Sequence, residues 1–323
     1  MGRMMIRMSE RTGGPGSPGG TVPEWAGWMS PRRYGEFIDL CADALAGHGV
    51  RAVYDGDGVL IAEDGTNYGL DNLSRIVRAE PPERWPQVVG AFFDSITDRD
   101  EAAGPIDPST VFLSCQPREA LPGPLAPALT EVLPGIVLVP AVDRPTSVEK
   151  LFGEGERTRP LGGLAGLVEL GRRNLARVRF EQEAIIVDHE RPDSVVVAIG
   201  ADDPYAAGRL GVLDAVVPAA HRGDVGIVVA APHQGLLLVH AIRGAGMVPA
   251  LNGMLRFARA QYASAPRALS PHLYFIDADG GVQRITGPVA DSELGIRVEG
   301  PFAAALQRAG MIDQASRAGE EQA

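Results

Sequence analysis

Two neighbouring aspartates in the second half of the chain are the strongest candidates for chemistry. Asp202 and Asp203 follow an apolar stretch and precede Pro204. Paired acids at the mouth of a sheet, with Arg209 to hold an anionic group and His233 on a nearby turn, would suit a hydrolase or a transferase. The alternative is structural. Aspartate before a proline is a common helix start, and His233 would then be an ordinary turn residue.

A second polar group lies where the first sheet passes into a helix. Asn72 and Arg75 could present a recognition face there. The simpler interpretation, which we favour, has Asp71 or Asn72 capping the helix, Leu70 and Leu73 entering the core and Arg75 on the surface.

Motifs for cofactors, metals and nucleophiles are weak. The glycine-rich segments 153–155 and 162–166 lack dinucleotide spacing, and no phosphate-binding loop motif is present. Residues 277–281 lack the later ligands of a calcium loop and predict a hairpin turn. The six histidines show no zinc-site spacing with Cys41 or Cys115, which we expect to be buried thiols. We expect neither a cofactor nor a metal.

Hydrophobic periodicity predicts the elements that would position these residues. In the first part we expect a helix at 33–46, strands at 50–54 and 59–63, a short helix ending at Arg78, and a helix from the prolines at 81–82 to Ile96. The inward residues of that last helix are predicted to be Trp85, Val88, Val89, Phe92 and Ile96.

The second part is richer in strands. Helices are predicted at 161–176, 205–217 and 251–263, and strands at 111–114, 136–139, 184–187, 195–199, 225–230, 236–242, 273–276 and 282–285. The four-residue turn 232–235 makes 225–242 a hairpin. The fold class is therefore α+β, with largely antiparallel sheets built from hairpins and with flanking helices. These elements could form two subdomains.

Composition suggests four segments. Residues 1–30 are expected to be a disordered tail that carries Trp25 and Trp28, which we expect to dock on their own domain. Residues 31–100 form an N-terminal helix-hairpin-helix subdomain and residues 101–313 a larger α+β subdomain. Residues 314–323 are expected to be a frayed tail.

Charge and hydropathy argue against two classes of partner. The formal net charge of −11 disfavours nucleic acid and anionic membranes. The sequence has no run of about 18 apolar residues, the length that a membrane-spanning helix needs, so we expect no such helix. Two separated cysteines fit a cytoplasmic protein.

The order of these features resembles the YtpQ-like family of uncharacterised bacterial proteins, a domain of unknown function. The resemblance covers about residues 33–290 and is carried by Leu70-Asp71-Asn72-Leu73 and by short segments at 143–148, 171–175, 205–210, 223–230 and 268–274. It implies a cytoplasmic α+β fold and no established activity, so it assigns no catalytic residues.

The sequence therefore favours a soluble, non-catalytic accessory module that binds another protein. Sheet edges that a partner strand could extend support this expectation. The alternative is the hydrolase or transferase assembled around Asp202, Asp203, Arg209 and His233.

Overall fold

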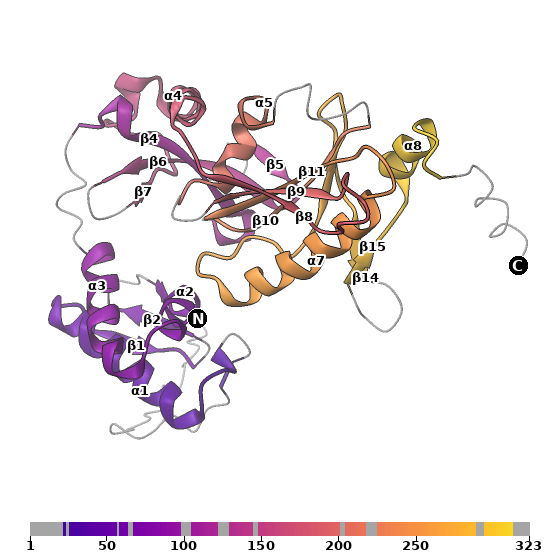
Figure 1. Cartoon of the computed structure of the whole chain (residues 1–323). Helices are drawn as coiled ribbons and strands as arrows, with labels where there is room; N and C mark the ends of the chain where they lie inside the picture. Colours follow the sequence, from indigo (N-terminus) through magenta and orange to yellow (C-terminus); the bar gives the residue numbers. More distant parts are fainter. Residues whose placement is uncertain are drawn as a thin grey trace, which may run out of the picture. The chain divides into compact units, whose positions relative to one another are not determined.

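The chain divides into two compact units, Met1–Thr97 and Asp98–Ala323 (Figure 1). The structure, a computed structural model, describes residues 22–23, 26–56, 58–63, 67–97, 105–121, 129–144, 148–200, 204–217, 225–288 and 294–312. Both units combine helices with antiparallel sheets, which confirms the predicted α+β class. No helix in these ranges is long and apolar enough to cross a membrane.

The first unit places helices against a small sheet. Its elements are α1 (Pro31–Gly47), β1 (Ala52–Tyr54), β2 (Val59–Ala62), β3 (Asn67–Gly69), α2 (Asp71–Arg78), the 3-10 helix η2 (Pro82–Arg84) and α3 (Trp85–Thr97). The strands form an antiparallel sheet in the order β1-β2-β3. α1 begins where the Ser30 hydroxyl accepts a hydrogen bond from the Arg33 amide, at 3.3 Å. Its apolar stripe is buried, as its spacing predicted: Tyr34, Phe37, Ile38, Cys41 and Leu45.

The inward face of α3 differs in part from the prediction. Trp85 and Val89 are buried as expected, but Phe93 is fully buried whereas Phe92 is only half-buried. Ile96 is exposed, so its predicted inward position was wrong. The difference comes from where the buried face of α3 begins. The 3-10 turn η2 directly precedes Trp85, and from Trp85 the buried positions 85, 89 and 93 follow at a spacing of four residues.

The last residues of the tail predicted at 1–30 belong to the first unit. Ala26 and Met29 are buried in the core of the first unit, so assigning residues 26–30 to the tail was wrong. Trp28 docks on its own unit, as expected: its indole Nε1 donates to the Ser74 hydroxyl at 3.2 Å, and its ring meets Trp85 edge-on. Residues 1–21, Trp25 and the predicted C-terminal tail lie outside the described residues.

The second unit is larger and contains two main sheets. Its strands are β4 (Val111–Pro117), β5 (Glu131–Leu133), β6 (Ile136–Asp143), β7 (Val148–Lys150), β8 (Gln182–Ile186), β9 (Val195–Gly200), β10 (Ile227–His233), β11 (Leu236–Ala241), β12 (Tyr274–Ile276), β13 (Val282–Arg284), β14 (Thr286–Pro288) and β15 (Leu294–Ile296). Its α-helices are α4 (Gly163–Arg177), α5 (Leu213–Val216), α7 (Met247–Ser264) and α8 (Gly300–Arg308), and its 3-10 helices are η4 (Pro108–Thr110), η5 (Arg118–Ala120), η7 (Arg159–Leu161) and η8 (Ala207–Val212).

Hairpins build the larger sheet. Its strand order is β13-β12-β10-β11-β9-β8, and every neighbouring pair is antiparallel. The hairpin of β10 and β11 pairs Ile227 with Ala241 and Val229 with Val239, which confirms the predicted hairpin around residues 232–235. In the smaller sheet, β6 lies between β4 and β5 and also pairs with β7.

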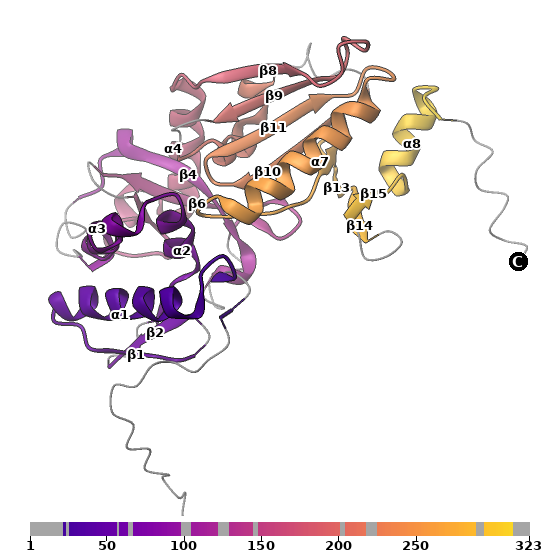
Figure 2. The ribbon, with the colours of Figure 1, turned by 60° about the horizontal axis from the view of Figure 1, so that its bottom comes forward.

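The larger sheet buries both of its faces over its central strands. On one face, Val228, Ala230 and Leu238 pack against α7 and α8, and α7 crosses this face in Figure 2. On the other face, Val229 and Leu237 share a core with residues of β4 and β6. Successive side chains of β10 and β11 thus pack into two different cores, because neighbouring residues of a strand point to opposite faces of the sheet.

A glycine allows η8 to lie directly on β4. A Cβ atom built on Gly208 would come within 1.9 Å of the Leu113 carbonyl oxygen. The continuous helix predicted for residues 205–217 was therefore wrong: the segment forms the short helices η8 and α5 against β4. Close packing against a neighbouring strand, which no local pattern reports, selects the tighter 3-10 geometry here.

Candidate functional site

Of the predicted catalytic group, the structure describes Arg209 and His233, and they do not line a common cavity. Asp202 and Asp203, including their predicted helix-capping role, lie outside the described residues. Arg209, in η8, is fully buried: its Nη1 donates to the Leu175 carbonyl at 3.0 Å, and its guanidinium lies 4.4 Å from the centre of the Phe180 ring. Arg209 borders a cavity of about 350 Å³, and His233 does not line that cavity.

His233 is less accessible than its turn position predicted. It ends β10, is half-buried, and its Nδ1 accepts a hydrogen bond from the Gly235 amide at 3.2 Å. Burial lowers the pKa of His233 below its ordinary value; a hydrogen bond with Gln261 opposes this shift and the positive charge of Arg267 adds to it. The imidazole is therefore mainly neutral at pH 7.

The recognition face predicted for the first unit is largely structural. Leu70 and Leu73 are fully buried, as expected. Neither Asp71 nor Asn72 caps α2, because the capping position is occupied by Leu70 without a side-chain hydrogen bond. Asp71 is instead the first helical residue, and its carboxylate accepts from Arg75 Nε at 3.0 Å.

Neither Asn72 nor Arg75 stands out from the surface of the first unit. Asn72 is half-buried, and the side chain of Arg75 is only 14% exposed. The expected surface position of Arg75 was wrong, because the i,i+4 ion pair with Asp71 holds its side chain along α2.

The two cysteines are buried free thiols, as predicted. Cys115 Sγ donates to the Ala207 carbonyl at 3.3 Å, and burial raises the pKa of the Cys115 thiol to about 12. A thiol held in this state is a poor nucleophile at neutral pH. Among the described residues no group of three or more acidic, histidine or cysteine side chains could hold a metal ion.

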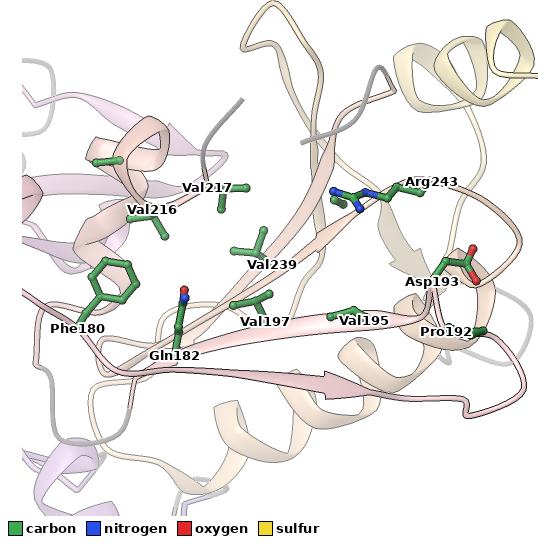
Figure 3. A pocket seen from close by; sticks show the side chains of 12 residues that line it. Phe180, Gln182, Pro192, Asp193, Val195, Val197, Val216, Val217, Val239 and Arg243 are labelled. Atoms are coloured by element: carbon green, nitrogen blue, oxygen red, sulfur yellow. The ribbon is translucent and has the colours of Figure 1, made fainter. Parts of the chain in front are cut away.

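A larger, mainly apolar pocket lies on the larger sheet, and none of the candidate residues from the sequence lines it. It has a volume of about 540 Å³. Figure 3 shows Val195 and Val197 of β9 and Val239 of β11 on one side, with Val216 of α5 across the opening. Polar groups reach its margin from Gln182, Asp193 and Arg243. Asp193 is held in place because its Oδ2 accepts from the Gly246 amide at 2.9 Å.

The sheet edge beside this pocket is open. β8 pairs with β9 on one side, and no described residue pairs with its other side. All five residues of β8 are exposed, and Ile185 and Ile186 are 40% and 43% exposed. Register places Ala184 opposite Val197 and Ile186 opposite Val195, so these two side chains extend the pocket face towards the edge.

The hydrogen bonds of β8 show which of its backbone groups face outwards. The Val187 amide donates to the Ser194 carbonyl at 3.1 Å, so Val187 points its backbone groups towards the neighbouring strand. Backbone direction alternates along an antiparallel strand. Gln182, Ala184 and Ile186 therefore present their amides and carbonyls to the open edge.

Sequence patterns missed this pocket and this edge. The strand itself was predicted, at residues 184–187, but nothing local identified it as the last strand of a sheet. The useful signal was the sequence Gln182-Glu183-Ala184-Ile185-Ile186, in which both faces carry an exposed apolar residue. A strand with one buried face would alternate instead.

The burial of His240 on β11 can be tested through the pH dependence of protein stability. Its ring is buried and its Nδ1 lies 2.8 Å from the Val195 carbonyl, so this nitrogen carries the proton. Burial lowers the pKa of His240, although the Val195 carbonyl and the charge of Asp193 act in the opposite direction. Unfolding releases the ring to its ordinary pKa of about 6.5.

We expect the free energy of unfolding to fall as the pH drops from 7 to 5. Below about pH 6.5 the unfolded chain binds a proton at His240 that the folded chain resists, at a cost of up to about 1.4 kcal/mol per pH unit. Urea unfolding at pH 7, 6 and 5 should show a smaller decrease for His240→Gln than for the wild type. The exposed His189→Gln variant serves as control, and an unchanged pH dependence in His240→Gln would contradict the assignment.

No family model matches this chain, and neither the curated proteins nor the solved structures include a match.

Proposed function

We propose that this protein is a non-catalytic binding module that takes up an extended segment of a partner protein at β8. The observation that carries the proposal is the open edge of β8: five exposed residues, outward amides and carbonyls at alternate positions, and an apolar pocket beside them. Strand addition uses such an edge, with main-chain hydrogen bonds for affinity and side-chain pockets for specificity.

The chemistry of the edge defines the segment that would fit. Partner side chains that face Ala184 and Ile186 would be apolar, because they continue the valine-lined pocket face. On the opposite face, a residue near Glu183 would be basic. The favoured partner is therefore an extended segment that alternates apolar and basic residues, and the net charge of −11 would favour its approach.

The edge has little of the protection that most proteins give to an exposed strand. Natural edge strands are commonly blunted by charged side chains, proline, bulges or a covering element. β8 has one charged residue, Glu183, and no proline, and its register with β9 runs without interruption over five pairs. A strand that is left open in this way either binds a partner or aggregates, and a functional edge is the interpretation we adopt.

The hydrolase or transferase alternative gains no positive support from the described residues, and Asp202 and Asp203 lie outside them. It required Asp202, Asp203, Arg209 and His233 to meet in one cavity. Arg209 is buried against Phe180, and His233 lies outside the cavity that Arg209 borders. Kinship with the YtpQ-like family, a cytoplasmic location and the absence of nucleic-acid partners remain predictions, supported by the sequence segments and the acidic charge.

Removing one outward amide should weaken partner binding at least about tenfold and leave the fold intact. Ala184→Pro deletes an amide that faces the open edge, where proline is tolerated. Affinity capture from the native host, read by mass spectrometry, should give a reproducible protein whose recovery falls at least about tenfold with Ala184→Pro, since each tenfold corresponds to about 1.4 kcal/mol. Ile185→Lys should weaken capture as well.

Val282→Lys is the matched control, because Val282 lies on β13 at the other end of the same sheet and is 39% exposed, like Ile185. It should retain the partner. Equal recovery with Ala184→Pro would refute binding at β8, and so would the failure to recover any reproducible partner. If the captured species is a second copy of the chain, size-exclusion chromatography will show a wild-type dimer that Ala184→Pro abolishes.

A further inference from the structure

The apolar pocket on the larger sheet has the size and lining of a small-molecule site. Its volume of about 540 Å³ falls within the roughly 300–1,000 Å³ that such sites occupy. Its walls come from segments far apart in the sequence: β8, the turn before β9, β9 itself, β11 and α5. The fold of this one chain therefore forms the pocket.

The sheet leaves apolar surface uncovered inside this pocket. β9 lies between β11 and β8, and Val196 is buried on the face that packs against α7. On the pocket face, Val195 and Val197 are only half-buried, although β9 is paired along both sides. Val216 of α5 lies across the opening and belongs to the same core cluster as Val239. Facing apolar walls favour the uptake of an apolar molecule, because it removes both walls from water.

A neutral polar side chain reaches into the apolar part of the pocket. Figure 3 shows the carboxamide of Gln182, on β8, directed towards Val216, with the Phe180 ring beside it. Register explains this direction, because Gln182 shares a strand face with Ala184, which lies opposite Val197. A carboxamide both donates and accepts hydrogen bonds, so it can bind a hydroxyl or a carbonyl group.

The charges at the opposite end of the pocket favour neither sign of ligand. Asp193 and Arg243 both line that end, and they carry opposite charges. An ion placed there would be attracted by one group and repelled by the other. The rest of the lining is mainly apolar, and burying a charge there without a partner is costly. An uncharged ligand avoids both costs.

We infer that this pocket binds a small uncharged ligand with an aromatic or branched apolar body and one hydroxyl or carbonyl group. The body would lie between the valines of the sheet and α5, and the polar group would form a hydrogen bond with the Gln182 side chain. The ligand would occupy the interior of the pocket, whereas a partner strand would pair with the backbone of β8. Ligand binding can therefore be measured without a partner protein, and it can fail while strand addition stands.

Three naphthalene derivatives that differ in their polar group test this inference. At pH 7, 2-naphthol is uncharged, 2-naphthoate is an anion and 2-naphthylmethylamine is a cation. Isothermal titration calorimetry on the full chain should show binding of 2-naphthol. We expect each ion to bind at least about tenfold more weakly, because the pocket offers no net attraction to either charge. The absence of 2-naphthol binding, or equal binding of either ion, would overturn the inference.

Variants locate the ligand. Val197→Phe fills the pocket from the sheet and should abolish 2-naphthol binding, whereas Val282→Phe on β13, which does not line the pocket, should retain it. Gln182→Met keeps the length of the side chain and removes its hydrogen bond, so it should weaken binding about fivefold.

A second filling variant decides the matter if Val197→Phe does not fold. Ala215 lines the pocket from α5 and is exposed, so Ala215→Trp should narrow the pocket without disturbing the core. Circular dichroism confirms that each variant is folded. Undiminished 2-naphthol affinity in Ala215→Trp, or in a folded Val197→Phe, would overturn the site, and undiminished affinity in Gln182→Met would overturn the hydrogen bond.

Discussion

Gly208→Ala is expected to lower the free energy of unfolding by about 3 kcal/mol or more, because the added methyl group has no room. It would come within 1.9 Å of the Leu113 carbonyl oxygen, which belongs to the backbone of β4 and is fixed by its pairing with β6. A flexible side chain could move aside, but a paired backbone cannot do so without breaking the sheet. The helix η8 would have to lift from β4, and the buried Arg209 would lift with it.

Urea unfolding followed by circular dichroism measures this loss. Gly155→Ala is the matched control, since it adds the same methyl group in the second unit with no atom within 4 Å and an ordinary backbone angle. It should change stability by less than about 0.5 kcal/mol. If Gly208→Ala is as stable as Gly155→Ala, η8 does not lie against β4 as described.

Phe93→Ala is expected to destabilise the first unit by about 3–5 kcal/mol. The ring of Phe93 is fully buried and meets Tyr68 and Phe92 edge-on, at centroid distances of 6.1 Å and 5.4 Å. Truncation removes both contacts and leaves a cavity between α3 and the segment before α2.

Phe92→Ala provides the comparison within the same helix. Phe92 is half-buried, so its truncation should cost about 1–2 kcal/mol. Thermal unfolding of both variants measures the difference. The sequence pattern placed Phe92 inward, and a larger loss for Phe92→Ala than for Phe93→Ala would favour that original assignment over the structure.

Local patterns in this sequence were sufficient for most elements and for the fold class. The stripe of α1, from Tyr34 to Leu45, follows from a spacing of three and four residues, which any helix converts into one face. The hairpin of β10 and β11 follows from two apolar runs that flank a four-residue turn. These elements can be predicted from local patterns because the residues that interact within each of them lie close together in the sequence.

The candidate sites were predicted less well, because their properties depend on distant neighbours. Composition and local patterns are enough to predict an acidic α+β protein with buried thiols and no recognisable catalytic motif. The burial of Arg209 is visible only in the folded chain, because the exposure of this side chain depends on how closely Gly208 approaches β4. Likewise, the strand order across the whole larger sheet makes β8 an edge strand. Pairing and charge proximity between segments far apart in the chain leave no local periodicity, so they emerge only when the chain is folded.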